Sequence, residues 1–174
     1  DYMGMQVERN EDTTDHSAFL QFVDVLNNGE PEAYSLALDV DRFLRYLALD
    51  TVLVNLDSYV GPGHNYYLYE ESDMFTVIPW DLNMSFGGFN CGCDREGIIN
   101  FRIDEPVCGP VSYFPLVQNL LAVDENMETY HGYIEELLSG LFTEEELLPR
   151  ISEVADMIRP YVEADPTGFY SLSE

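Results

Sequence analysis

The chain has 174 residues, and its seven Lys plus Arg stand against 33 Asp plus Glu, which gives a formal net charge of −26 at pH 7. With 46% hydrophobic residues, this length fits one globular domain or lobe and leaves no room for two domains of ordinary size. The acidic charge argues against phosphate-backbone binding, and no apolar run approaches the roughly 18 residues of a membrane span. We therefore expect neither a nucleic-acid partner nor a membrane span.

Two amphipathic helices are predicted in the first third of the chain. Apolar residues recur at helical spacing over 13–28 and again over 39–57, where the stripe is apolar on nearly every side. The second helix should therefore be central to the core, and the Gly-Pro-Gly sequence at 61–63 excludes any continuation. Two strand-like runs follow, over 65–69 and 74–80, and the polar turn between them predicts a hairpin.

The chain after the hairpin is predicted to be a loop followed by helices. Residues 91–110 form a loop that bears Gly and Cys, and 113–162 form a helical C-terminal part with a capping box at Thr143 and Glu146. The fold class expected is α+β, as a single domain or lobe over 1–174. It is mostly helical, and the segment 57–90 supplies the hairpin and the polar loops.

Three cysteines, Cys91, Cys93 and Cys108, lie in or near the long loop and cannot all pair within one chain. We expect them to be reduced thiols. Two alternatives stay open, a bridge from Cys91 or Cys93 to Cys108 and a soft-metal site that uses all three.

Polar side chains gather between 57 and 83, in a segment otherwise built of aromatic and aliphatic residues. Asp57 ends the predicted buried helix, and a hairpin would bring Asn65 and Asp81 to the same edge of the sheet. An amide oxygen and a carboxylate there can bind Mg²⁺, and Asp57 could accept a proton from a hydroxyl nucleophile. Asp and Asn at loop ends also commonly cap helices and close turns, so spacing alone leaves both interpretations open.

The motifs HNYYLY at 64–69 and IPWDLNMSFG at 78–87 closely resemble the signature of the spore coat protein H (CotH) kinase family. The matched motifs span roughly 55–88. The resemblance implies an atypical protein-kinase-like fold that transfers phosphate from Mg-ATP to Ser of coat proteins. It also implies that Asp57 is the catalytic-loop aspartate, and that Asn65 and Asp81 hold the metal. His64 is expected to orient the loop.

The resemblance also identifies what the segment lacks. A kinase needs a phosphate cover, a Lys on the phosphates and a helix Glu that pairs with it, and the sequence offers no candidate for them. We therefore expect a C-terminal, helix-rich lobe whose N-terminal nucleotide-binding lobe is not present.

Three functions remain open from the sequence. The first is an atypical protein kinase with ATP and Mg²⁺ as cofactors, acting on Ser/Thr of a coat or surface protein. Its substrate would be rich in Lys, Arg and Ser, because the acidic surface attracts basic chains. The second is an inactive kinase-like scaffold of a spore coat or cell-surface assembly, and the third is a carbohydrate-associated surface protein. The expected location is the spore coat or the extracellular surface of a bacterium.

Overall fold

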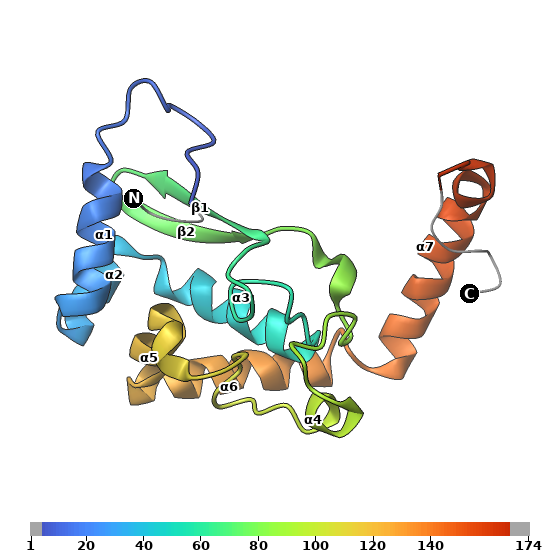
Figure 1. Cartoon of the computed structure of the whole chain (residues 1–174). Helices are drawn as coiled ribbons and strands as arrows, with labels where there is room; N and C mark the ends of the chain where they lie inside the picture. Colours follow the sequence, from blue (N-terminus) through green and yellow to red (C-terminus); the bar gives the residue numbers. More distant parts are fainter. Residues whose placement is uncertain (1–4, 168–174) are drawn as a thin grey trace. The chain divides into compact units, whose positions relative to one another are not determined.

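Helix α3 (Val40–Val52) forms the centre of the core, as the nearly all-round apolar stripe predicts. In Figure 1 it runs between the hairpin and α6 (Asp124–Ser139). Thr51 Oγ1 and Tyr130 Oη form a hydrogen bond of 2.9 Å that ties α3 to α6. The side chains of α3 that lie fully out of solvent are Phe43, Leu47 and Ala48.

The computed structural model describes residues 5–167 and divides into two compact units, 1–134 and 135–174, with the boundary inside α6. The predicted α+β class is confirmed. The other elements are α1 (Ser17–Asn28), α2 (Pro31–Ala37), β1 (Tyr66–Glu71), β2 (Met74–Pro79), η1 (Leu82–Met84), α4 (Arg95–Ile99), η2 (Val111–Tyr113), α5 (Pro115–Leu121) and α7 (Glu144–Ala164).

Helix α1 begins four residues later than the predicted start at residue 13. The N–H groups of Thr13 and Thr14 both donate to Asn10 O at 2.9 Å, which closes a turn in place of helix. The Asp15 carboxylate then accepts from Ser17 N at 2.9 Å, so the first helical residue is Ser17. Helix α2 was not predicted, because its seven residues, which begin with Pro31, carry too short a pattern of apolar residues to be recognised.

The hairpin has the predicted position, with Tyr66 opposite Pro79 at its open end and Glu71 opposite Met74 at its turn. Ser72 and Asp73 form the turn with φ of 56° and 64°. Two left-handed residues define the type I′ turn, whose twist matches that of the paired strands. Strand β2 packs on the helices through Phe75, whose ring stacks on Phe22 of α1 at 4.8 Å.

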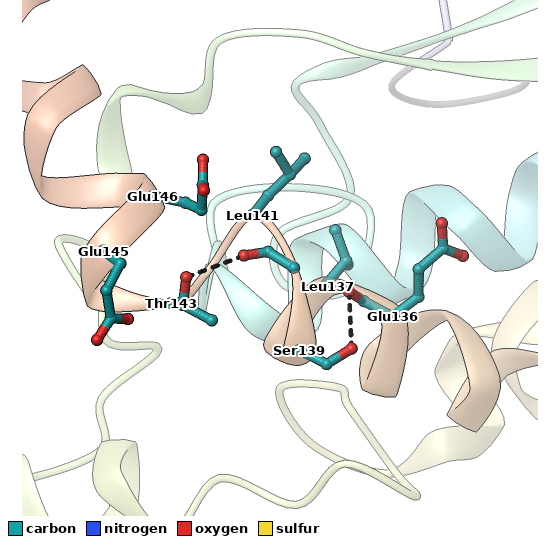
Figure 2. Close-up of a pocket in the computed structure, with 8 residues that line it drawn as sticks. Glu136, Leu137, Ser139, Leu141, Thr143, Glu145 and Glu146 are labelled. Carbon is teal, nitrogen blue, oxygen red and sulfur yellow. Dashed lines mark hydrogen bonds between the residues drawn. The ribbon is translucent and has the colours of Figure 1, made fainter.

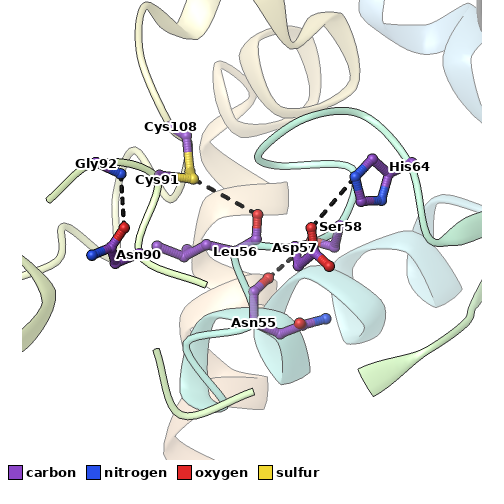
Figure 3. Close-up of a disulfide and its surroundings, with 9 residues drawn as sticks. All are labelled: Asn55, Leu56, Asp57, Ser58, His64, Asn90, Cys91, Gly92 and Cys108. Carbon is purple, nitrogen blue, oxygen red and sulfur yellow. Dashed lines mark hydrogen bonds and ion pairs between the residues drawn. A yellow bond between two sulfur atoms is a disulfide. The ribbon is translucent and has the colours of Figure 1, made fainter. Parts of the chain in front are cut away.

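The long loop after the hairpin is cross-linked, because Cys91 and Cys108 form a disulfide. The expectation of three reduced thiols is therefore wrong for this pair, and one of the alternative bridges is present, while Cys93 is a free, half-buried thiol. Figure 3 shows the disulfide beside the segment at 55–58. Cys91 Sγ lies 3.8 Å from Leu56 O, and Cys108 N donates to Val60 O at 2.8 Å.

In the second unit, α7 buries none of its side chains. Its predicted capping box does not form, because Thr143 Oγ1 donates to Gly140 O at 3.1 Å instead of accepting from the first turn of α7. The apolar side chains exposed along α7 include Leu148, Ile151, Val154, Ile158 and Tyr161. Among the helices within 5–167, none combines the length and the apolar character needed to cross a membrane.

Replacing Cys91 by Ser should lower the free energy of unfolding, because the disulfide closes a loop across a sequence separation of 17 residues. A loop of this size is worth about 3 kcal/mol in the chain-entropy description. Urea unfolding of the wild type and of Cys91→Ser, without reductant, measures the difference. Cys93→Ser is the matched control, and a control variant as unstable as Cys91→Ser would contradict the assigned pairing.

Candidate active site

The C-terminal end of α3 turns sharply at Val54, whose φ is 48°. Asn55 N donates to Asp50 O at 2.9 Å, and Val54 N donates to Thr51 O at 3.1 Å. These are the two hydrogen bonds of a Schellman motif, in which the left-handed residue is usually Gly. A β-branched residue in this conformation is a genuine outlier, so backbone strain is present directly before the predicted catalytic loop.

The loop that follows is anchored by burial on both sides of Asp57. Asn55, Leu56, Ser58 and Val60 are buried, whereas the Asp57 side chain is 19% exposed. The ring of Tyr59 makes edge contacts with the rings of Phe43, Tyr66 and Phe114, and its hydroxyl accepts from Leu116 N at 3.1 Å. The loop therefore presents Asp57 to solvent while its neighbours hold the backbone in place.

Asp57 is brought together with two of the residues expected near it. Asn65 Nδ2 donates to Asp57 Oδ2 at 3.1 Å and to Asp57 O at 2.8 Å. His64 Nε2 lies 3.4 Å from Asp57 Oδ1, an ion pair when the imidazole is protonated. Figure 3 shows the carboxylate of Asp57 directed toward His64. Each carboxylate oxygen thus has one partner, and the expected role of His64 in orienting the loop stays a prediction.

Asp81 follows the end of β2, across the hairpin from Asn65. Hydrogen bonds tie the segment around Asp81 to the loop that contains Asp57. Trp80 N donates to Asn65 O at 3.0 Å, and beyond Asp81 the chain returns so that Phe86 N donates to Leu53 O at 2.6 Å and Gly87 N donates to Val54 O at 3.1 Å. The segment 80–87 is therefore fixed at both ends onto 53–65. No interaction within 5–167 joins the side chain of Asp81 to Asp57 or Asn65, so the shared site of all three remains a prediction.

The two predicted metal ligands share a backbone feature. Asn65 has φ of 56° and Asp81 has φ of 50°, so both sit in the left-handed region at the open end of the hairpin. Asn and Asp are the residue types that tolerate this conformation best after Gly. The type of residue at each position therefore has a structural reason as well as a chemical one.

The donor set fits Mg²⁺ that arrives with a nucleotide. Asn65 uses its Nδ2 group on Asp57, which leaves the amide oxygen as a ligand, and Asp81 supplies a solvent-exposed carboxylate. Within 5–167, no cluster of three His, Cys, Asp or Glu side chains could hold a metal ion. Two protein oxygens suit Mg²⁺, which keeps several waters and takes further ligands from phosphates.

A buried polar cluster beneath the loop was not found from the sequence. Asp50 is 1% exposed, and its Oδ1 accepts from Asn55 Nδ2 at 3.0 Å. Ser58 Oγ donates to Asn55 O at 2.9 Å. Burial raises the pKa of the Asp50 carboxyl, and the hydrogen bond from Asn55 together with the nearby hydroxyl groups of Ser58 and Tyr46 opposes this shift without cancelling it. An acidic residue in an amphipathic helix normally faces solvent, so the position of Asp50 in the sequence gave no indication that it is buried.

The outer face of the hairpin remains exposed, and its inner face is covered. Tyr67 and Trp80 make an edge contact at 5.5 Å between ring centroids, and both rings are at least 40% exposed. Phe75 and Val77 are buried on the inner face. Strand β2 therefore buries alternate side chains on one face against the helices.

A surface hollow in the second unit, about 480 Å³ in volume, contains none of the predicted site residues. Figure 2 shows that its two hydroxyl side chains are engaged with backbone carbonyls. The dashed lines in Figure 2 join Ser139 Oγ to Glu136 O at 3.4 Å and Thr143 Oγ1 to Gly140 O, and Ser139 Oγ also donates to Glu135 O at 2.7 Å. The remaining polar side chains of the hollow are Glu136, Glu145 and Glu146.

The comparison with known proteins bears on this geometry. The family model for CotH kinase protein matches residues 1–174. The chain belongs to this family. A curated CotH relative, inner spore coat protein H of Bacillus subtilis (strain 168), is 34% identical over 131 residues, which are 74% of this chain and 33% of the relative. The CotH chain thus spans about one third of the length of the curated relative it matches. The roles of Asp57, Asn65 and Asp81 remain predictions.

Val54→Gly should raise the free energy of unfolding. A left-handed conformation costs a non-glycine residue about 1–2 kcal/mol, which outweighs the apolar contact of a half-buried valine side chain. Thermal unfolding of the two proteins tests this. Leu53→Gly is the control, because Leu53 has φ of −72° and should lose stability. A Val54→Gly variant less stable than the wild type would contradict the strain at this position.

Proposed function

We propose that this chain is part of an atypical protein kinase that transfers the ATP γ-phosphate to Ser or Thr of a coat or surface protein with Mg²⁺. The observation that carries the proposal is the tethering of 80–87 onto 53–65, which supports a shared site for Asp57, Asn65 and Asp81. Phosphoryl transfer requires positioning, a carboxylate near the nucleophile and oxygen ligands for the metal. The family to which the chain belongs supports the same reaction class.

In this proposal Asp57 accepts the proton of the substrate hydroxyl as the oxygen attacks the γ-phosphorus. The P–O bond to the β-phosphate breaks, ADP leaves, and the hydroxyl proton resides on Asp57. Asn65 and His64 hold the carboxylate in one orientation through its two oxygens. The exposed part of Asp57 leaves room for a protein hydroxyl to approach.

Asn65 Oδ1 and the Asp81 carboxylate would hold Mg²⁺. When bound, the ion neutralises charge on the phosphates. The two residues are carried by the open end of one hairpin, whose register pairs Tyr66 with Pro79. The register of the strands brings the backbones of the two positions to the same end of the hairpin, which supports a shared metal site.

The protein substrate proposed is a basic chain with hydroxyl side chains. A net charge of −26 steers Lys- and Arg-rich segments toward the surface and repels acidic ones. The name of the relative places that protein in the inner spore coat, which supports the spore coat as the location of this chain as well. A coat protein with clustered Lys, Arg and Ser is the substrate class to test first.

Asp81→Ala in the natural full-length protein should abolish Mg²⁺-dependent ATP binding, because it removes the charged metal ligand. Isothermal titration of ATP with and without Mg²⁺ measures the loss. Asp73→Ala is the matched control, since Asp73 is also a left-handed Asp of the same hairpin but lies at its turn. Metal-dependent binding that survives in Asp81→Ala would remove Asp81 from the metal site.

Asp57→Asn should lower kcat by about 10²- to 10⁴-fold, the usual contribution of general base catalysis, with little change in the affinity for ATP. Asn keeps the size of the side chain and can still pair with Asn65. Initial rates with radiolabelled ATP and a basic Ser-containing peptide give kcat and KM separately. A fall in kcat together with a comparable loss of affinity for ATP would identify Asp57 as a structural cap.

The second candidate is an inactive kinase-like scaffold, which would keep the fold without binding a metal ion or a nucleotide. An intact full-length protein that binds no ATP in the titration above would support the scaffold and exclude the kinase.

A further inference from the structure

The buried cluster under the predicted catalytic loop has a second connection that bears on function. Asn55 is bound twice to Asp50, through its backbone N–H at 2.9 Å and through Nδ2 at 3.0 Å. Ser58 in turn donates to Asn55 O. Asn55 precedes Asp57 and Ser58 follows it, so the Asp50 carboxyl is joined directly to the start of the segment that presents Asp57, and Ser58 is joined to Asn55.

Within 5–167, no charged group compensates the carboxyl of Asp50. The side chains that act on its carboxyl are Tyr46, Asn55 and Ser58, all of them uncharged. Asp50 and Asn55 are 1% and 0% exposed, so an ionised carboxylate would be a buried charge without a counterion. Such a group normally takes up a proton.

The unpaired atoms of the cluster agree with a protonated group. Among the described residues, the buried side-chain atoms without a hydrogen-bond partner are Asp50 Oδ2, Asn55 Oδ1 and Tyr46 Oη, although Asp50 and Asn55 are already joined through Oδ1 and Nδ2. Asp50 Oδ2 and Asn55 Oδ1 are acceptors, whereas the Tyr46 hydroxyl can donate or accept. A proton on Oδ2 converts one of these two acceptors into a donor, so an acid and an amide can pair through two hydrogen bonds.

We propose that Asp50 is a positioning residue that acts as an uncharged carboxylic acid, paired with Asn55, and thereby fixes the loop that presents Asp57. Asp50 contacts neither substrate nor metal in this assignment. Its effect on phosphoryl transfer rests on the proposed function, whereas its protonation and its hold on the loop do not.

The activity test compares three variants of the natural full-length protein. Asp50→Ala should lower kcat by about 10- to 100-fold, the effect of a small misplacement, and leave the KM for ATP within about twofold. Asp50→Asn should keep at least half of kcat, because an amide also donates and accepts toward Asn55. Thr51→Ala is the control, since Thr51 is buried in the same helix but bonds toward Tyr130. It should lose stability and keep kcat.

A second test measures the charge state through stability. The folded-state pKa of Asp50 is raised above the unfolded value, so its stabilising contribution is complete below the unfolded pKa and is lost as pH rises through the folded pKa. The free energy of unfolding of the wild type should therefore fall relative to that of Asp50→Asn as pH rises. Urea unfolding of both proteins at each pH measures this difference. Two results would overturn the assignment of Asp50 as an uncharged acid. One is a difference in the free energy of unfolding between the wild type and Asp50→Asn that does not change with pH, and the other is a kcat of Asp50→Asn as low as that of Asp50→Ala.

A third measurement is independent of catalysis. Hydrogen exchange of the backbone amides at 55–58 should accelerate in Asp50→Ala and return to the wild-type rate in Asp50→Asn. If the protein transfers no phosphate, the proposed function fails while this result still decides the positioning role. Unchanged exchange in Asp50→Ala, or faster exchange at 55–58 in Thr51→Ala to the same degree, would overturn it.

Discussion

Three backbone hydrogen bonds between 53–65 and 80–87 form the constraint on which the candidate site depends. Trp80 N to Asn65 O closes the hairpin end, and Phe86 N to Leu53 O with Gly87 N to Val54 O closes the far side. Because backbone groups make all three bonds, side-chain replacement leaves the tether in place. The backbone thus brings the two loops together, and the side chains are left to supply the chemical groups.

The sequence predicted those parts of the fold that depend on local pattern. The hairpin could be placed because two strand-like runs and the polar turn at 70–73 between them are properties of neighbouring residues. The proximity of Asn65 and Asp81 followed directly from that hairpin. The start of α1 could not be predicted, since the Asn10 turn competes with a helix of similar propensity over the same residues. The roles of Asp57, Asn65 and Asp81 came from family resemblance, and geometry alone would not have assigned them.

The features that escaped prediction are those decided by tertiary burial. Asp50 carries the same carboxyl group as the many acidic residues on the surface, and only the buried position of its helix face distinguishes it. Val54 is β-branched, so nothing in its type indicates a left-handed turn. The bridge from Cys91 to Cys108 depended on how the long loop folds over Leu56. The strained Val54, the buried Asp50 and the disulfide all lie next to the Asp57 loop. Around this loop the conformation and the burial differ most from what the residue types would favour locally.

The double attachment of 80–87 also bears on how the sequence of this segment can change. An extra residue between Trp80 and Phe86 cannot be absorbed by sliding, because both ends are fixed to different parts of 53–65. Exchanges at exposed positions such as Leu82 leave the attachments untouched. Insertions and deletions in this segment should therefore be rarer among related chains than substitutions. The length of the segment is then a better marker of shared geometry than the identity of most of its residues.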